Sequence, residues 1–164
     1  MERTIIHGLS VDLYTLADNL VDQYLQSFSP LIQSILHVQD LKHEQEYLED
    51  ALQKTSKPFF YLIAHKDNQT IVGSIEIRDP GYRCQIYCWI NEQYWGQGFF
   101  QEAMKLATHN YFEITDTQSI TARVDVDNKR SYHALQKAGF VEIAKARGPH
   151  GLQYEMILCR NLKV

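Results

Sequence analysis

The chain has 164 residues, a net charge of −4, 45% hydrophobic and 22% charged residues, which is typical of a single soluble globular domain over residues 1–164. An acidic balance without any cluster of Lys and Arg excludes the electrostatic footprint of a nucleic-acid binder. No run approaches the ~18 apolar residues of a membrane span, and the start of the chain, residues 1–4, lacks the basic and apolar regions of a secretory signal.

The first third of the chain is expected to be helical after a short opening strand at 4–9. Apolar side chains recur there at helical spacing, namely Leu13, Leu16, Leu20, Tyr24 and Leu25. Ser29-Pro30 interrupts this pattern. Two further helical stretches are predicted at 31–37 and 43–54.

The period then changes to that of strands. Residues 59–65 are almost continuously apolar, and 71–77 alternate so that Ser74 and Glu76 fall on a weakly polar outer face. Asp67-Asn68 between the two runs predicts a hairpin, and a third strand follows at 84–90. Two of the three cysteines lie four residues apart in this strand, or ~13 Å, too far for a disulfide or a shared metal ion. The histidines show no ligand spacing either, so we expect no metal and a reducing, cytoplasmic location.

Residues 99–114 form the clearest amphipathic helix of the chain, and the alternation at 120–126 predicts another strand. Asn128 is a suitable N-cap for a short helix that Gly139 closes. Two last strands are predicted at 140–146 and 152–160. The order β α α α β β β α β α β β indicates a mixed α/β sheet and excludes a doubly wound one.

Between the third strand and the amphipathic helix lies a loop at 91–98 with two glycines, Gly96 and Gly98. Glycines at a strand-to-helix turn allow successive backbone N–H groups to converge at the positive end of the helix, where a pyrophosphate can bind without a basic side chain. On its own the pattern is better explained by a tight turn. Gln101 stands where a dinucleotide-binding turn needs a small residue, and the Gly-Lys-Ser/Thr of a Walker loop is absent.

The surroundings of this loop resemble the GNAT superfamily of acetyl-CoA-dependent N-acetyltransferases, in particular its RimJ/RimL-like branch of ribosomal-protein N-acetyltransferases. Residues 94–99, Tyr-Trp-Gly-Gln-Gly-Phe, followed by Glu102-Ala103, are similar to the Tyr-Trp-Gly-x-Gly…Glu-Ala signature of that branch. Residues 128–131 and 137–140 are similar to its Asn-x-x-Ser…Lys-x-Gly-Phe signature. The resemblance covers residues 71–146, and the rest of the chain only in element order.

The resemblance implies an acetyl-CoA site, with two registers open. The superfamily motif Arg/Gln-x-x-Gly-x-Gly/Ala fits literally from Gln93, whereas the branch signature aligns Trp95 with its first position and puts the bulky Phe100 where a small residue is usual. Both registers place the amides of 95–100 around the phosphates. The implied cofactor-binding residues are Ile90, Asn91, Trp95, Gly96, Gln97, Gly98, Phe99, Phe100, Asn128 and Ser131.

The resemblance also implies a GNAT-type fold, with a mostly antiparallel central sheet, flanking helices and a splayed strand pair at 84–90 and 119–126 that receives the pantetheine arm. An amine would attack the thioester directly, and free N–H groups near Ile90 to Glu92 would polarise its carbonyl. Asp125 and Glu76 are candidate bases; they are also explained as a strand-end cap and a solvated face. Leu135 occupies the position at which many members of the superfamily have a tyrosine that protonates the leaving thiolate. Ser131 is therefore the candidate proton donor to the leaving sulfur, and Tyr132 is a weaker candidate.

The expected acceptor is a protein N-terminal α-amine or a small-molecule amine. We expect the helical first third and the loop at 147–151 to shape the site that binds it. The alternative is a non-catalytic acyl-CoA-binding sensor or regulatory module, which Leu135 and Phe100 favour. A dinucleotide enzyme would rest on the two glycines alone. No nucleic-acid or membrane partner is expected, and an exposed last strand is compatible with a homodimer.

Overall fold

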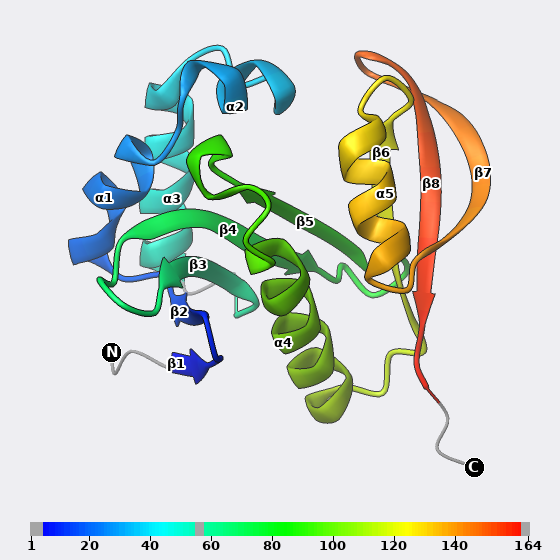
Figure 1. Cartoon of the computed structure of the whole chain (residues 1–164), viewed down its shortest axis with the longest axis horizontal. Coiled ribbons are helices and arrows are strands. Elements are labelled where there is room, and N and C mark those ends of the chain that lie inside the picture. Colours follow the sequence, from blue (N-terminus) through cyan, green and yellow to red (C-terminus); the bar gives the residue numbers. More distant parts are fainter. Residues whose placement is uncertain (1–4, 55–57, 162–164) are drawn as a thin grey trace. The chain divides into compact units, whose positions relative to one another are not determined.

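A computed structural model describes residues 5–54 and 58–161 of the chain (Figure 1). Its elements, in chain order, are β1 (Ile5–His7), β2 (Val11–Thr15), the 3₁₀ turn η1 (Asp18–Leu20), α1 (Val21–Gln26), α2 (Pro30–Ile35), α3 (Leu41–Lys54), β3 (Phe60–His65), β4 (Ile71–Arg78), β5 (Gln85–Ile90), the 3₁₀ turn η2 (Glu92–Tyr94), α4 (Phe99–Ile114), β6 (Ser119–Asp125), α5 (Lys129–Lys137), β7 (Val141–Gly148) and β8 (Gly151–Cys159). The helix predicted at 99–114 is confirmed with those bounds.

The strands of the described residues are hydrogen-bonded in the order β1-β2-β3-β4-β5-β6-β8-β7. Strand β5 runs parallel to β6, with Gln85 opposite Thr121, whereas β1/β2, β2/β3, β3/β4, β6/β8 and β7/β8 are antiparallel. The predicted fold class, a mixed α/β sheet that is mostly antiparallel and has flanking helices, is thereby confirmed.

The helix expected from Leu13 onward is wrong at its start, because residues 11–15 form strand β2. Leu13 is fully buried and lies opposite Ile6 of β1 on one side and Ile63 of β3 on the other. Over so few residues an apolar spacing of three or four fits a strand as well as a helix. The pairing with β3, far along the chain, decides for the strand.

The weakly polar outer face expected of β4 is also wrong, because all of Ile71 to Ile77 is buried. Its two polar side chains are covered by tyrosines from the helices before it. Tyr24 of α1 lies with its hydroxyl 3.0 Å from Ser74 Oγ, and Tyr47 of α3 donates to Glu76 Oε1 over 3.2 Å. A buried polar group needs such partners.

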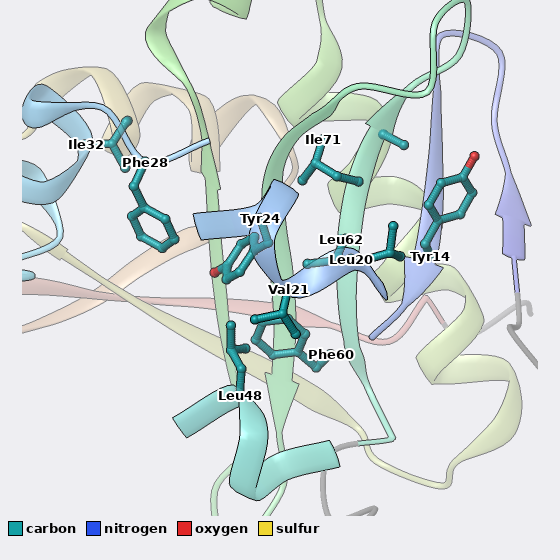
Figure 2. Close-up of a cluster of buried hydrophobic side chains, with 11 residues drawn as sticks. Tyr14, Leu20, Val21, Tyr24, Phe28, Ile32, Leu48, Phe60, Leu62 and Ile71 are labelled. Carbon is teal, nitrogen blue, oxygen red and sulfur yellow. The ribbon is translucent and has the colours of Figure 1, made fainter. Parts of the chain in front are cut away.

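The chain divides into two compact units. The first comprises Met1–Glu76 and Cys88–Ala107, and the second comprises Ile77–Tyr87 and Thr108–Val164. In the first unit α1 and α3 lie side by side (Figure 1), and a cluster of buried side chains packs between the helices and the strands (Figure 2). Its members are Tyr14, Leu20, Val21, Tyr24, Phe28, Ile32, Leu48, Phe60, Leu62, Ala64 and Ile71.

In the second unit α5 lies beside β6 (Figure 1). Its buried side chains include Ile120 and Val124 of β6, Leu135 of α5 and Met156 of β8. Strand β7 is exposed along most of its length. No helix among the residues that the structure describes is long and apolar enough to cross a membrane.

Candidate functional site

The loop between β5 and α4 adopts a backbone conformation that requires glycine at two positions. Gly96 has a φ of 79° and Gly98 a φ of 81°, in the left-handed region that costs an L-residue about 1–2 kcal/mol. A Cβ built on either glycine meets no atom within 4 Å, and residues 96–98 are exposed. The glycines therefore serve the curvature of the loop and leave its backbone open to solvent.

This exposed loop leads into the N-terminus of a long helix. α4 has 16 residues and begins at Phe99, directly after Gly98, and its first-turn amides have no partner within the helix. The helix dipole adds a partial positive charge there. Residues 91–98 contain no Lys or Arg, so the loop suits an anion such as a pyrophosphate that is bound by backbone amides. The residues present therefore fit the phosphates of acetyl-CoA.

Aromatic side chains hold the loop against its own unit. The indole nitrogen of Trp95 donates to the carbonyl of Ile90 over 2.7 Å, which closes the loop onto the end of β5. Phe99 is buried, with its ring 5.1 Å from that of His65 and 6.2 Å from that of Tyr94. Among the implied cofactor residues, Trp95 and Phe99 thus have packing roles, while Gln97 is exposed and Phe100 is half-buried.

The sequence predicts free backbone N–H groups near the end of β5, but the backbone amide of Asn91 is not free. Its own amide donates to the carbonyl of Val72 over 2.8 Å, so this N–H is already used by the sheet. Its side chain accepts from the amide of Gln93 over 3.0 Å and donates to the carbonyl of Ser27 over 2.8 Å. Asn91 therefore shapes the entry into the loop, and its amide is not available to a thioester carbonyl.

Glu102, which served only as a motif marker in the sequence, joins α4 to the N-terminal hairpin. Its carboxylate accepts hydrogen bonds from the amides of Leu9 and Ser10, in the turn between β1 and β2, and of Val11, the first residue of β2. Amides that converge on a carboxylate in this way make strong, charge-assisted hydrogen bonds. Because these partners lie more than ninety positions away, the sequence carried no local signal for this role.

Glu76, a candidate base, is only 5% exposed, so its explanation as a solvated face is wrong. The hydroxyl of Tyr47 lies 3.2 and 3.4 Å from its two carboxylate oxygens. Burial, reinforced by the negative charges of Glu44 and Glu76, raises the pKa of the neighbouring Tyr24. Glu76 thus belongs to a low-dielectric, negatively charged part of the first unit.

The other candidate side chains belong to one turn of the second unit, where β6 leads into α5. Asn128 caps α5, with its side-chain oxygen 3.1 Å from the amide of Ser131. Asp125 accepts from the side-chain amide of Gln153 over 2.9 Å, so it is bound from across the sheet. Ser131 is half-buried in the first turn of the helix.

The side chain of Tyr132, the weaker candidate donor, is bound to Glu142 of β7. Its hydroxyl donates to Glu142 over 3.1 Å, and this hydrogen bond raises the pKa of the phenol. The Tyr132 hydroxyl is therefore engaged by Glu142, and Ser131 is another hydroxyl of this turn. Among the described residues, no group of three His, Cys, Asp or Glu side chains could hold a metal ion.

Comparison with known proteins gives a consistent result. A family model described as an acetyltransferase (GNAT) domain matches residues 10–141, whereas no curated protein matches the chain. A GNAT-family acetyltransferase from Bacillus anthracis is 14% identical with a TM-score of 0.82, over 95% of this chain and 98% of that one.

Two further structures with printed activities share the fold. A spermidine N-acetyltransferase chimera from Vibrio cholerae and hSSAT is 15% identical with a TM-score of 0.75, over 92% of this chain and 96% of that one. The ribosomal-protein-S5-alanine acetyltransferase from Vibrio fischeri is 13% identical with a TM-score of 0.72, over 95% and 96%. At these identities the likeness concerns the fold alone.

Proposed function

The chain belongs to the GNAT acetyltransferase family, whose co-substrate is acetyl-CoA, and we propose that it acetylates a primary amine by direct attack in a ternary complex. The observation that carries this proposal is the open loop of Gly96 and Gly98 at the N-terminus of α4. The match to the family runs through both compact units, which supports one acetyltransferase domain over residues 1–164.

In the proposed reaction the amine nitrogen forms a bond to the thioester carbonyl carbon, the C–S bond breaks, and CoA leaves as a thiolate. One proton passes from the amine to a base, and one proton neutralises the thiolate. The attacking amine must be neutral. An α-amine with a pKa near 8 is ~10% neutral at pH 7, a deficit of about 1.4 kcal/mol, whereas a lysine or polyamine nitrogen is ~0.04% neutral, a deficit of roughly 4.6 kcal/mol.

The acceptor classes remain a protein N-terminal α-amine and a small-molecule amine. Structures that share the fold carry both activities in their names, a ribosomal-protein alanine acetyltransferase and a spermidine acetyltransferase. The free-energy deficits separate the two classes, because a polyamine needs a committed base and an α-amine needs little help. Measured turnover on each class therefore also reports on the base.

We assign the base to Glu76 rather than Asp125. Glu76 belongs to the same compact unit as the glycine loop, and its carboxylate is buried beside the Tyr47 hydroxyl. Asp125 belongs to the other unit and is held by Gln153. Ser131 is the proposed donor to the leaving sulfur. Its place in the first turn of α5 matches the motif, and its hydroxyl is not used by the Asn128 cap.

The test is release of free thiol from acetyl-CoA with N-terminal peptides, polyamines and aminoglycosides, using wild type, Glu76→Gln and Asp125→Asn. Turnover with one amine class confirms the enzyme and names its acceptor. With a polyamine acceptor, Glu76→Gln should lower kcat about 100-fold without weakening acetyl-CoA binding, whereas Asp125→Asn should leave kcat unchanged. Binding of acetyl-CoA without turnover of any amine would instead support the sensor module, and loss of kcat in Asp125→Asn alone would move the base.

A further inference from the structure

Three consecutive residues at the junction of α1 and α2 are each bound by the end of β5 and the start of the glycine loop. The carbonyl of Ser27 accepts from the side chain of Asn91 over 2.8 Å. The hydroxyl of Ser29 donates to Glu92 over 2.6 Å. Between them, the buried ring of Phe28 lies 4.5 Å from that of Trp89. All of these residues belong to the first compact unit.

The Ser29 hydroxyl performs two functions at once. Its oxygen accepts from the amide of Ile32 over 3.1 Å and thereby caps α2, while its single proton points to the Glu92 carboxylate. Because a hydroxyl has one donor and directs its lone pairs accordingly, Glu92 fixes the orientation in which Ser29 caps the helix. The bond to a charged acceptor is also stronger than a neutral one.

Both helices at this junction depend on such links. α1 and α2 have 6 residues each, far fewer than an isolated helix needs in water. Their order must come from tertiary contacts, and the contacts at their junction include those of residues 89–92. Asn91 and Glu92 begin the loop at 91–98 that is proposed to bind the phosphates, so their side chains link this loop to the start of α2 by hydrogen bonds.

We propose that Glu92 and Asn91 are positioning residues that couple acetyl-CoA binding in the glycine loop to the order of α1 and α2. The inference rests on the proposed acetyl-CoA site. Binding that holds the loop in one conformation also holds the Ser29 cap, and α2 then loses less conformational freedom when an acceptor binds to the part of the chain expected to shape its site. By linkage, an acceptor that orders α2 raises the affinity for acetyl-CoA by the same factor.

Hydrogen exchange of the intact protein with and without acetyl-CoA tests the coupling. The reporters are the amides of Gln33 and Leu36, which donate to the carbonyls of Ser29 and Ile32. Acetyl-CoA should slow their exchange at least about fivefold in wild type and in Ser29→Thr, which keeps the hydroxyl. Ser29→Ala and Glu92→Ala should lose this slowing while still binding acetyl-CoA in a calorimetric titration. Glu92→Ala is the sharper variant, since it leaves the Ser29 cap on Ile32 in place.

Glu142→Ala is the matched control, because Glu142 also accepts a hydroxyl, that of Tyr132 over 3.1 Å, and belongs to the other unit. It should retain the full slowing. The inference is overturned if wild type binds acetyl-CoA without slowing of α2 exchange, or if Glu92→Ala responds like wild type. If wild type does not bind acetyl-CoA in the titration, the proposed function fails and the inference fails with it. Binding without slowing of exchange overturns the inference alone, so the titration distinguishes the two failures.

Discussion

The turns from β5 to α4 and from β6 to α5 begin alike and end differently. Asn91 follows β5 and accepts the amide of Gln93, and Asn128 follows β6 and accepts the amide of Ser131. After Asn128 the helix starts at once. After Asn91 the chain makes a 3₁₀ turn and a glycine loop before α4 begins. The first turn exposes backbone and suits a phosphate, whereas the second presents side chains, among them Ser131.

The largest expected effect comes from breaking the first turn. Gly98→Val places a β-branched side chain at a φ of 81° beside the exposed loop backbone, and we expect the Kd of acetyl-CoA to rise at least about thirtyfold, or ~2 kcal/mol. The matched control is Gly81→Val, at a φ of 98° with no atom within 4 Å of its Cβ. It carries the same strain without a helix N-terminus. Equal loss of affinity in both variants, measured by calorimetry, would remove the loop from the site.

The two asparagines should differ in their contribution to stability. Asn128→Ala removes one cap, which costs about 1 kcal/mol of unfolding free energy. Asn91→Ala removes a cap and also the hydrogen bond to Ser27 over 2.8 Å, so we expect about 2 kcal/mol. Urea denaturation of both variants measures the difference. A cost for Asn128→Ala equal to or larger than that for Asn91→Ala would show that the links of the first turn are not stabilising.

The second turn can be tested by its hydroxyl. Ser131→Ala should lower kcat about threefold to tenfold, because water protonates the leaving thiolate less effectively than a positioned hydroxyl does. Ser131→Thr keeps the hydroxyl and should retain most of the activity. The measurement is steady-state thiol release. An unchanged kcat in the alanine variant would leave Ser131 with a structural role only.

A third turn, between β4 and β5, gives the smallest effect and a pH dependence. The hydroxyl of Tyr111 and the amide of Gly81 bind the Asp79 carboxylate and lower its pKa below 3.8. A lowered pKa in the folded state stabilises above the unfolded value, and this stabilisation is lost as the pH falls through the folded one. Asp79→Asn should therefore be less stable than wild type at pH 7, and the gap should close below about pH 4. A gap that stays constant in acid would contradict this origin.

What the sequence predicted well is local. Asn128 and the helix that it caps, the glycine after that helix and the full extent of α4 all depend on residues within a few positions of one another. Capping and amphipathic spacing are expressed in the chain itself. The identity of the family was predicted in the same way, from motifs whose residues stand close together.

What the sequence did not predict depends on distant partners. Strand β2, which the apolar spacing assigns to a helix, pairs with β1 and, about fifty residues later, with β3. The burial of Glu76 depends on Tyr47 from another element. The bonds of Asn91 and Glu92 to the α1–α2 junction span 64 and 63 positions. No periodicity within the chain encodes such pairs, so only a three-dimensional structure reveals how the loop is held.

The most direct test of the central claim compares the binding of acetyl-CoA with that of S-acetyl-pantetheine, which lacks the pyrophosphate and the nucleotide. If the amides of the loop at 96–98 hold the phosphates, wild type should bind acetyl-CoA at least about thirtyfold more tightly, and Gly98→Val should abolish most of that difference. Equal affinities of wild type for the two ligands, or a difference that Gly98→Val leaves intact, would contradict the account.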